Sequence, residues 1–176
     1  MISTASAALL LLASASEATF WPQWRGPLGN GVSPDASPPI EWSEERNLAW
    51  KVAVPGRGKG SPVVWGDRIF LLTAEASASA PPRRIEDPTG SHPSVAPASE
   101  VLRFTVLALS RMDGTTLWSK VVREDQPHDG AHHDGSFASS SPSTDGERLF
   151  AYFGSQGLYA LDFEGRLLWE KDFGDL

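Results

Sequence analysis

An internal repeat constrains the fold of this chain more than any other feature of its sequence. Residues 61–70, SPVVWGDRIF, match residues 141–150, SPSTDGERLF, in a Ser-Pro pair, a Gly-acid-Arg turn and an aliphatic-Phe pair. Residues 107–120 match residues 159–171 in Ala-Leu, an acid-Gly pair, Leu-Trp and Lys, with one residue of slippage. Because the two matches follow one another in the same order, the chain contains two copies of one supersecondary unit.

Each copy contains two turn signals that divide it into four short strands. An acidic residue beside Gly between apolar runs favours a tight hairpin, because Gly accepts the positive φ of primed turns. The alternation of apolar and polar residues in 148–153 is also typical of a strand. In the second copy the strands are expected near residues 139–144, 147–153, 157–163 and 166–172. The turn signals are Gly66-Asp67 and Asp113-Gly114 in the first copy, and Asp145-Gly146 and Glu164-Gly165 in the second.

Four-stranded antiparallel units that repeat every 40 to 50 residues or so are typical of the blades of a β-propeller. Trp118 and Trp169 occupy the same place in the two copies and stand 51 residues apart. The sequence therefore predicts an all-β chain, a β-propeller of four-stranded antiparallel blades. Propellers usually need about four to eight blades, whereas about two are present here. We therefore expect an incomplete ring and a chain that is a fragment of a longer protein.

The repeat also predicts how the chain is divided. Ala, Ser and Pro supply 15 of the 26 residues in 75–100, so this segment is expected to be a flexible surface insertion between the second and third strands of the first blade. Trp50 lies in a Leu-Ala-Trp-Lys run that resembles the end of each repeat, which predicts a strand near 48–54 that closes the ring. The expected segments are a signal peptide at 1–18, an N-terminal segment at 19–60, blade 1 at 61–122, an inter-blade loop at 123–138 and blade 2 at 139–174.

The amino-terminal residues have the plan of a secretory signal. An apolar run at 7–13 is followed by small residues that offer A-x-A-like cleavage sites, and it is too short to cross a membrane. The positively charged region is represented only by the amino group of Met1, and the alternative is a short buried helix, which this run lacks the amphipathic stripe to form. We expect export to the periplasm or the exterior, with no transmembrane segment after the signal is removed.

Charge and cysteine content exclude several classes of function. The net charge of −7 argues against nucleic acid as a partner, because such binding depends on many cationic contacts. The chain has no Cys, which excludes disulfides, thiol catalysis and thiolate metal sites within it.

The repeated residues resemble the blade motif Ala-x-Asp-x-x-x-Gly-x-x-x-Trp of the pyrroloquinoline-quinone-like (PQQ-like) repeat propellers. In the first blade Ser110 stands where the motif has Asp. The opening at residues 21–31, with Trp-Pro-Gln-Trp-Arg-Gly-Pro, is also similar to exported bacterial members of this family. The matching residues are Ala160, Asp162, Gly165 and Trp169 in the second blade, and Ala108, Gly114 and Trp118 in the first. We expect Trp50, Trp118 and Trp169 to dock between neighbouring blades, each indole N–H on a carbonyl.

The resemblance implies the fold more firmly than it implies an activity. Such families include quinoprotein dehydrogenases, which resemble one another in a vicinal Cys pair, a Ca²⁺ site and an Asp base, and also scaffolds without catalysis. No motif here allows those catalytic residues to be carried over. The prediction is a non-catalytic binding or scaffold module, without a cofactor, for a protein or polymer partner. The alternatives are part of a quinone-dependent dehydrogenase, with PQQ and Ca²⁺ held by further blades, and a polysaccharide-binding module.

One loop concentrates side chains that can carry chemistry. His128, His132, His133 and Asp134 lie in seven residues of the inter-blade segment. Imidazole and carboxylate groups are ligands for transition metals, but the run is interrupted by Gly, so nothing in the sequence fixes its geometry. Three interpretations stay open: a metal site, a lining of the axial funnel and a solvated loop.

Overall fold

The computed structural model describes residues 20–34, 36–79, 81–82, 95–96 and 98–174, and the predicted signal peptide lies outside them. These residues form three antiparallel sheets and one short 3₁₀ helix, and the described part of the chain contains no α-helix. The prediction of an all-β fold is therefore confirmed. No helix in the described residues has the length and apolarity to cross a bilayer.

The first blade is a five-stranded sheet with the order β1-β2-β3-β5-β6. β3 and β5 pair along nine residues each and form its centre, and β6 covers the outer side of β5. The N-terminal strand β1 pairs with β2 and adds a strand that the repeat did not predict. The strands are β1 at Phe20–Trp21, β2 at Val63–Trp65, β3 at Arg68–Ala76, β5 at Leu102–Ser110 and β6 at Thr116–Asp125.

The second blade is a four-stranded sheet with the order β11-β10-β9-β8. Its strands follow the predicted meander but are shorter than the sequence pattern suggested. The 3₁₀ helix η1 joins the two hairpins where the sequence predicted a short link. The elements are β8 at Ser143–Thr144, β9 at Leu149–Tyr152, η1 at Gly154–Gln156, β10 at Leu158–Leu161 and β11 at Leu167–Lys171.

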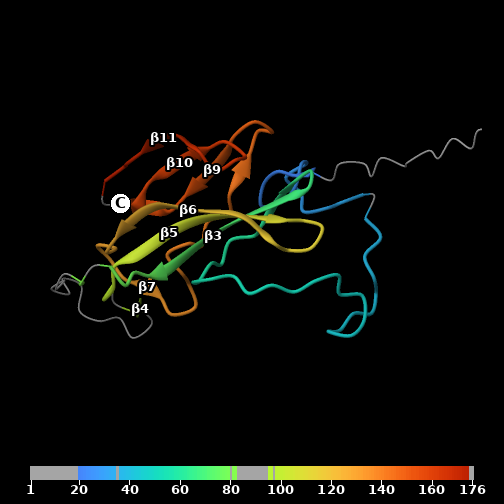
Figure 1. Ribbon diagram of the computed structural model, residues 1–176, viewed down its shortest axis with the longest axis horizontal. Helices are drawn as coiled ribbons and strands as arrows, with labels where there is room; N and C mark the ends of the chain where they lie inside the picture. The colour runs from blue at the N-terminus through green and yellow to red at the C-terminus, as the bar shows by residue number, and fades with distance from the viewer. Residues whose placement is uncertain (1–19, 35, 80, 83–94, 97, 175–176) are drawn as a thin grey trace, which may run out of the picture.

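The two blades lie face to face and share one hydrophobic core, as the orange-red sheet above the green-yellow sheet shows in Figure 1. Phe70 and Phe104 of blade 1 and Leu149 and Leu161 of blade 2 have no exposed side-chain surface. The ring of Phe104 meets that of Phe153 edge-on, with centroids 5.4 Å apart. Removal of this apolar surface from water holds the blades together, and the arrangement is that of a partial β-propeller.

The insertion predicted at 75–100 is ordered at both of its ends. Glu75 and Ala76 belong to β3, so the insertion begins later than its composition suggested. The two-residue strand β4, Val95–Ala96, pairs with β7, Ala131–His132, of the inter-blade loop. The side-chain amide of Gln126 donates to the Ala98 carbonyl at 2.7 Å. Composition alone missed these anchors because they depend on contacts with a distant loop, and residues 83–94 lie outside the described part.

Residues 48–54 are described, but they do not pair with any strand of the described sheets. The predicted closing strand would pair with a blade outside this chain, so the ring closure at 48–54 stays a prediction. Trp50 in this segment instead contacts the turn between β5 and β6.

Candidate functional site

One end of the two blades, here called the loop end, gathers three connections. It holds the ends of the insertion between β3 and β5, the loop from β6 to β8, and the link from β9 to β10. A cavity of about 310 Å³ opens there between the inter-blade loop and η1. Its lining residues are Pro127, His128, Asp129, Gly130, Ala131, Ser136, Phe137, Ser139, Ser140, Phe153, Gly154, Ser155 and Gln156.

Gln156 is held firmly in the wall of this cavity. Its backbone N–H donates to the Phe153 carbonyl at 3.1 Å, and its own carbonyl accepts the Tyr159 hydroxyl at 2.7 Å. Burial raises the pKa of Tyr159, so the phenol stays a donor in this contact. The residue is only 6% exposed, and its side-chain oxygen Oε1 has no hydrogen-bond partner among the described residues. A buried acceptor without a donor is unfavourable. Because Oε1 has almost no accessible surface, a ligand reaches this oxygen only if the Gln156 side chain rotates towards the cavity.

The serines of the cavity divide into two kinds. Ser136 and Ser139 bond to one another: the Ser139 hydroxyl donates to the Ser136 carbonyl at 2.7 Å and accepts the Ser136 N–H at 3.0 Å. These bonds fix the shape of the loop. The hydroxyls of Ser140 and Ser155 make no hydrogen bond with the described part of the chain, so they remain available to a ligand.

The structure separates the four polar residues that the sequence placed in one candidate site. His128 lines the cavity, whereas His132, His133 and Asp134 do not. The rings of His132 and His133 stack with centroids 4.4 Å apart, and Asp134 Oδ2 lies 3.5 Å from His133 Nε2. These three side chains present one ligand atom each within 4.8 Å of one another.

The donor set suits a transition metal in kind, but the side chains are 53%, 60% and 80% exposed. The backbone N–H of Asp134 also donates to His132 Nδ1 at 3.2 Å, which leaves Nε2 as the free ligand atom of that ring. The metal site, the funnel lining and the solvated loop therefore all stay predictions.

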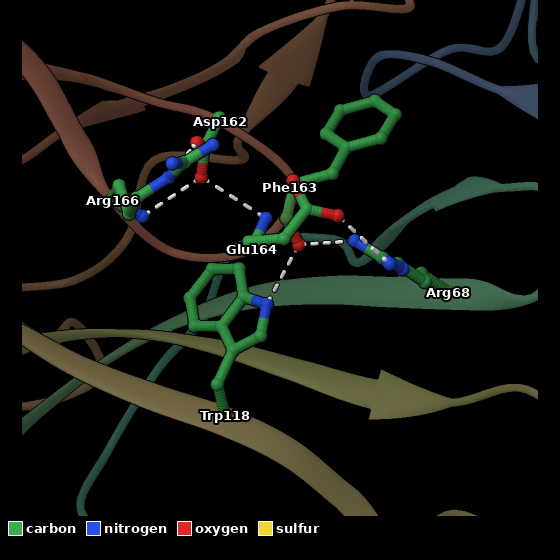
Figure 2. Close-up of polar contacts among 6 residues, drawn as sticks. All are labelled: Arg68, Trp118, Asp162, Phe163, Glu164 and Arg166. Atoms are coloured by element: carbon green, nitrogen blue, oxygen red, sulfur yellow. Dashed lines mark hydrogen bonds and ion pairs between the residues drawn. The ribbon is translucent and has the colours of Figure 1, made fainter.

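At the opposite end of the blades, a tryptophan of one blade meets a turn of the next. Figure 2 shows the indole of Trp118 in β6 donating to the Phe163 carbonyl, at 2.8 Å, in the turn between β10 and β11. The Arg68 guanidinium donates to the same carbonyl and forms an ion pair with Glu164 at 3.2 Å. Blade 1 is therefore bonded to blade 2 by two side chains that share one acceptor.

Asp162 shapes the turn that receives Trp118. Its Oδ1 accepts the backbone N–H groups of Glu164 and Arg166 at 3.0 and 2.8 Å, and its Oδ2 accepts Arg166 Nε at 2.6 Å (Figure 2). Burial alone would raise the pKa of Asp162, but these donors outweigh burial and lower it. Gly165 in the same turn has φ of 82°, and a Cβ there would meet the Trp118 ring at 2.8 Å.

The N-terminal segment makes the same contact with blade 1. The Trp50 indole donates to the Arg111 carbonyl at 3.0 Å, and its ring covers Gly114 as that of Trp118 covers Gly165. Trp169, the third member of the series, is 42% exposed on β11. The small motif residues Ala108 and Ala160 are fully buried, and each pairs across the sheet with the Trp of its own blade.

Sequence reasoning missed the cavity residues Gln156, Ser140, Ser155, Phe137 and Phe153. The available signal was the polar Gln156 between Gly154 and Gly157, in a link that needs only a few residues to join two hairpins. Nothing in the sequence shows that this link lies beside the inter-blade loop, because their proximity depends on how the two blades dock.

A repeated meander of four strands, with a tryptophan that meets an acid-Gly turn later in the chain, defines a protein built from PQQ-like repeats. Over residues 40–173 the chain matches the family model described as outer membrane protein assembly factor BamB, and it belongs to this family. No curated protein sequence matches the chain.

Proposed function

We propose that this chain is part of an exported, non-catalytic propeller that binds a partner protein or polymer through its loop end. The observation that carries the proposal is the cavity between the inter-blade loop and η1. Its lining includes Gln156 Oε1 and the hydroxyls of Ser140 and Ser155, which have no hydrogen-bond partner among the described residues. Loops held by a rigid scaffold are the usual place for binding residues. The exposed His132, His133 and Asp134 beside the cavity extend the polar surface available to a partner.

The family description supports a location for this binding. The matched family model is described as an outer membrane protein assembly factor, and we propose a periplasmic or extracellular location for this chain. Expression in a Gram-negative host, followed by fractionation and mass determination of the mature amino terminus, tests export. Recovery of the intact leader in the cytoplasm would contradict it.

The partner surface can be tested by site-specific cross-linking. A photo-crosslinking amino acid at Asp134, which is 80% exposed on the loop end, is expected to trap a discrete partner in the periplasm. The matched control is Met112, which is 83% exposed in the turn at the opposite end of blade 1. Equal cross-linking from both positions, or none from Asp134 beside a productive Met112, would place the binding surface elsewhere.

The proposed module needs neither PQQ nor Ca²⁺. Addition of both to the purified protein is expected to leave its thermal unfolding midpoint unchanged and to give no dye reduction with alcohols. A midpoint that rises with PQQ concentration would instead favour the quinone-dependent dehydrogenase, because a ligand that binds the native state stabilises it.

A further inference from the structure

The cavity at the loop end carries an indication of which ligand it takes. Gln156 Oε1 is a buried acceptor with no donor among the described residues. The hydroxyls of Ser140 and Ser155 can both donate and accept. A complementary ligand must therefore offer at least one hydrogen-bond donor to Gln156. It must also offer groups that can donate to or accept from the two serine hydroxyls.

The charge of the lining argues for an uncharged ligand. None of the described residues that line the cavity is Lys or Arg, and His128 is the only one of them that can carry a positive charge, so an anion would find no permanently cationic partner. Asp129 is exposed, and one of its oxygens already accepts the backbone N–H of Gly130 at 2.7 Å. Its negative charge further disfavours phosphate or carboxylate in the cavity.

The remaining walls are apolar and rigid. Phe153 is 4% exposed, and its ring contacts those of Phe104 and Tyr159 at 5.4 and 6.2 Å, which holds it in place. Phe137 and Pro127 add further apolar surface. A ligand that has both hydroxyl groups and a face of C–H groups matches a cavity whose walls carry aromatic rings and serine hydroxyls. The volume of about 310 Å³ is at the lower end of ligand sites, which suits a small unit.

We propose that this cavity binds a single saccharide unit, free or at the end of a glycan, with a sugar hydroxyl donating to Gln156. The inference rests on the proposed binding function and names a ligand class for the same site. The sugar ring packs its C–H face on Phe137, since Phe153 is only 4% exposed, and its other hydroxyls bond to Ser140 and Ser155.

The test is saturation-transfer NMR and calorimetry on the 176-residue chain with glucose, N-acetylglucosamine and galactose. At least one of these sugars is expected to bind with a dissociation constant of about 1 mM. Glucuronate, which replaces a hydroxymethyl group with a carboxylate, is the matched charged probe and is expected to bind about tenfold more weakly or not at all.

Two variants and a control locate the binding. Gln156→Leu removes the buried acceptor, and Ser155→Ala removes a hydroxyl at the cavity; each is expected to weaken sugar binding about tenfold. Ser119→Ala, at an exposed position on β6 away from the cavity, is expected to leave binding unchanged. Circular dichroism checks that each variant is folded, and Ser155→Ala supplies the test if Gln156→Leu does not fold.

Two results would overturn the inference. One is the absence of binding to all three sugars at concentrations well above the expected constant, and the other is binding that Ser155→Ala and Gln156→Leu leave unchanged. If the cross-linker at position 134 still traps a partner in that case, the proposed binding function survives and the saccharide assignment alone is wrong. Loss of both signals would reject the proposed function as well.

Discussion

Trp118 and Phe163 join the two blades through an indole N–H that donates to a backbone carbonyl at 2.8 Å. Trp50 and Arg111 repeat this geometry at 3.0 Å, although Trp50 lies in the segment between β1 and β2. In both pairs the indole ring also covers the Gly of the acceptor turn. The same contact therefore occurs twice in the chain. From its geometry we can predict how substitutions at its residues change stability.

The Trp118 contact is expected to contribute through both its ring and its N–H. Trp118→Ala should lower the free energy of unfolding by about 3 kcal/mol, because it removes packing against Phe70 and Gly165. Trp118→Phe keeps a ring and should cost about 1 kcal/mol for the lost hydrogen bond. Urea unfolding measures both. Trp169→Phe on the exposed β11 is the control, and an equal loss there would show that the inter-blade contact adds nothing.

Gly165 is expected to tolerate no side chain, for two separate reasons. Its φ is 82°, and a Cβ would lie 2.8 Å from the Trp118 ring. Gly165→Ala should therefore destabilise the fold by about 3 kcal/mol. Gly154→Ala is the matched control, because Gly154 has φ of 63° with nothing near its Cβ, and it should cost about 1 kcal/mol.

A double-mutant cycle separates the two causes at Gly165. In a Trp118→Ala background the ring is absent, so Gly165→Ala should cost only about 1 kcal/mol, a coupling of about 2 kcal/mol. Additive effects in urea unfolding would contradict the close approach of Trp118 to this turn.

The turn carboxylates are expected to make stability depend on acid. The Arg148 backbone N–H, and then that of Glu147, lower the pKa of Asp145. Because the folded pKa lies below the unfolded value of about 3.9, the contribution of Asp145 is complete above about pH 4 and is lost as the pH falls through the folded pKa. Asp145→Asn should therefore reduce stability at pH 6 and flatten its decline in acid.

The control for this pH dependence is Asp67→Asn. The Asp67 carboxylate accepts no hydrogen bond within the described residues, so this substitution removes a turn carboxylate without removing a turn hydrogen bond. Urea unfolding at pH 6, 4 and 3, or nearby values, provides the comparison. An unchanged slope for Asp145→Asn would show that its turn hydrogen bonds do not favour the charged carboxylate.

Gln126 is expected to hold the end of the insertion on the inter-blade loop. Gln126→Met keeps the size of the side chain but leaves the Ala98 carbonyl without its donor, at a local cost of about 2 kcal/mol. Amide hydrogen exchange should show faster exchange in β4 and β7. Gln23→Met removes a comparable hydrogen bond to the Gly26 carbonyl and should leave amide exchange in the paired strands β4 and β7 unchanged. Equal amide exchange rates of β4 and β7 in both variants would assign the stability of this pair to other contacts.

The repeat predicted the blades because each hairpin is encoded by adjacent residues. The Gly66, Gly114, Gly146 and Gly165 turns all lie between paired strands, as the acid-Gly pairs indicated. The pairing of β1 with β2 could not be predicted in this way, because two residues carry no periodicity. The pairing of β4 with β7 could not be predicted for the same reason, and these two strands also lie far apart in the sequence.

The site was less predictable than the fold. The sequence pointed to the inter-blade loop, part of which lines the cavity, but it grouped His128 with His132 and His133 because they are close along the chain. In the structure only His128 of these three lines the cavity, and Gln156 completes the wall from a different blade connection. Such a wall depends on blade docking, which no local pattern encodes.

In both Trp-to-turn contacts the tryptophan comes before its acceptor turn in the sequence. Trp50 precedes its acceptor by 61 residues, and Trp118 precedes its acceptor by 45. Each indole therefore leaves the ribosome before the turn that receives it. In both contacts the hairpin that supplies the acceptor forms against a ring that is already part of the chain, which favours addition of the blades from the amino terminus.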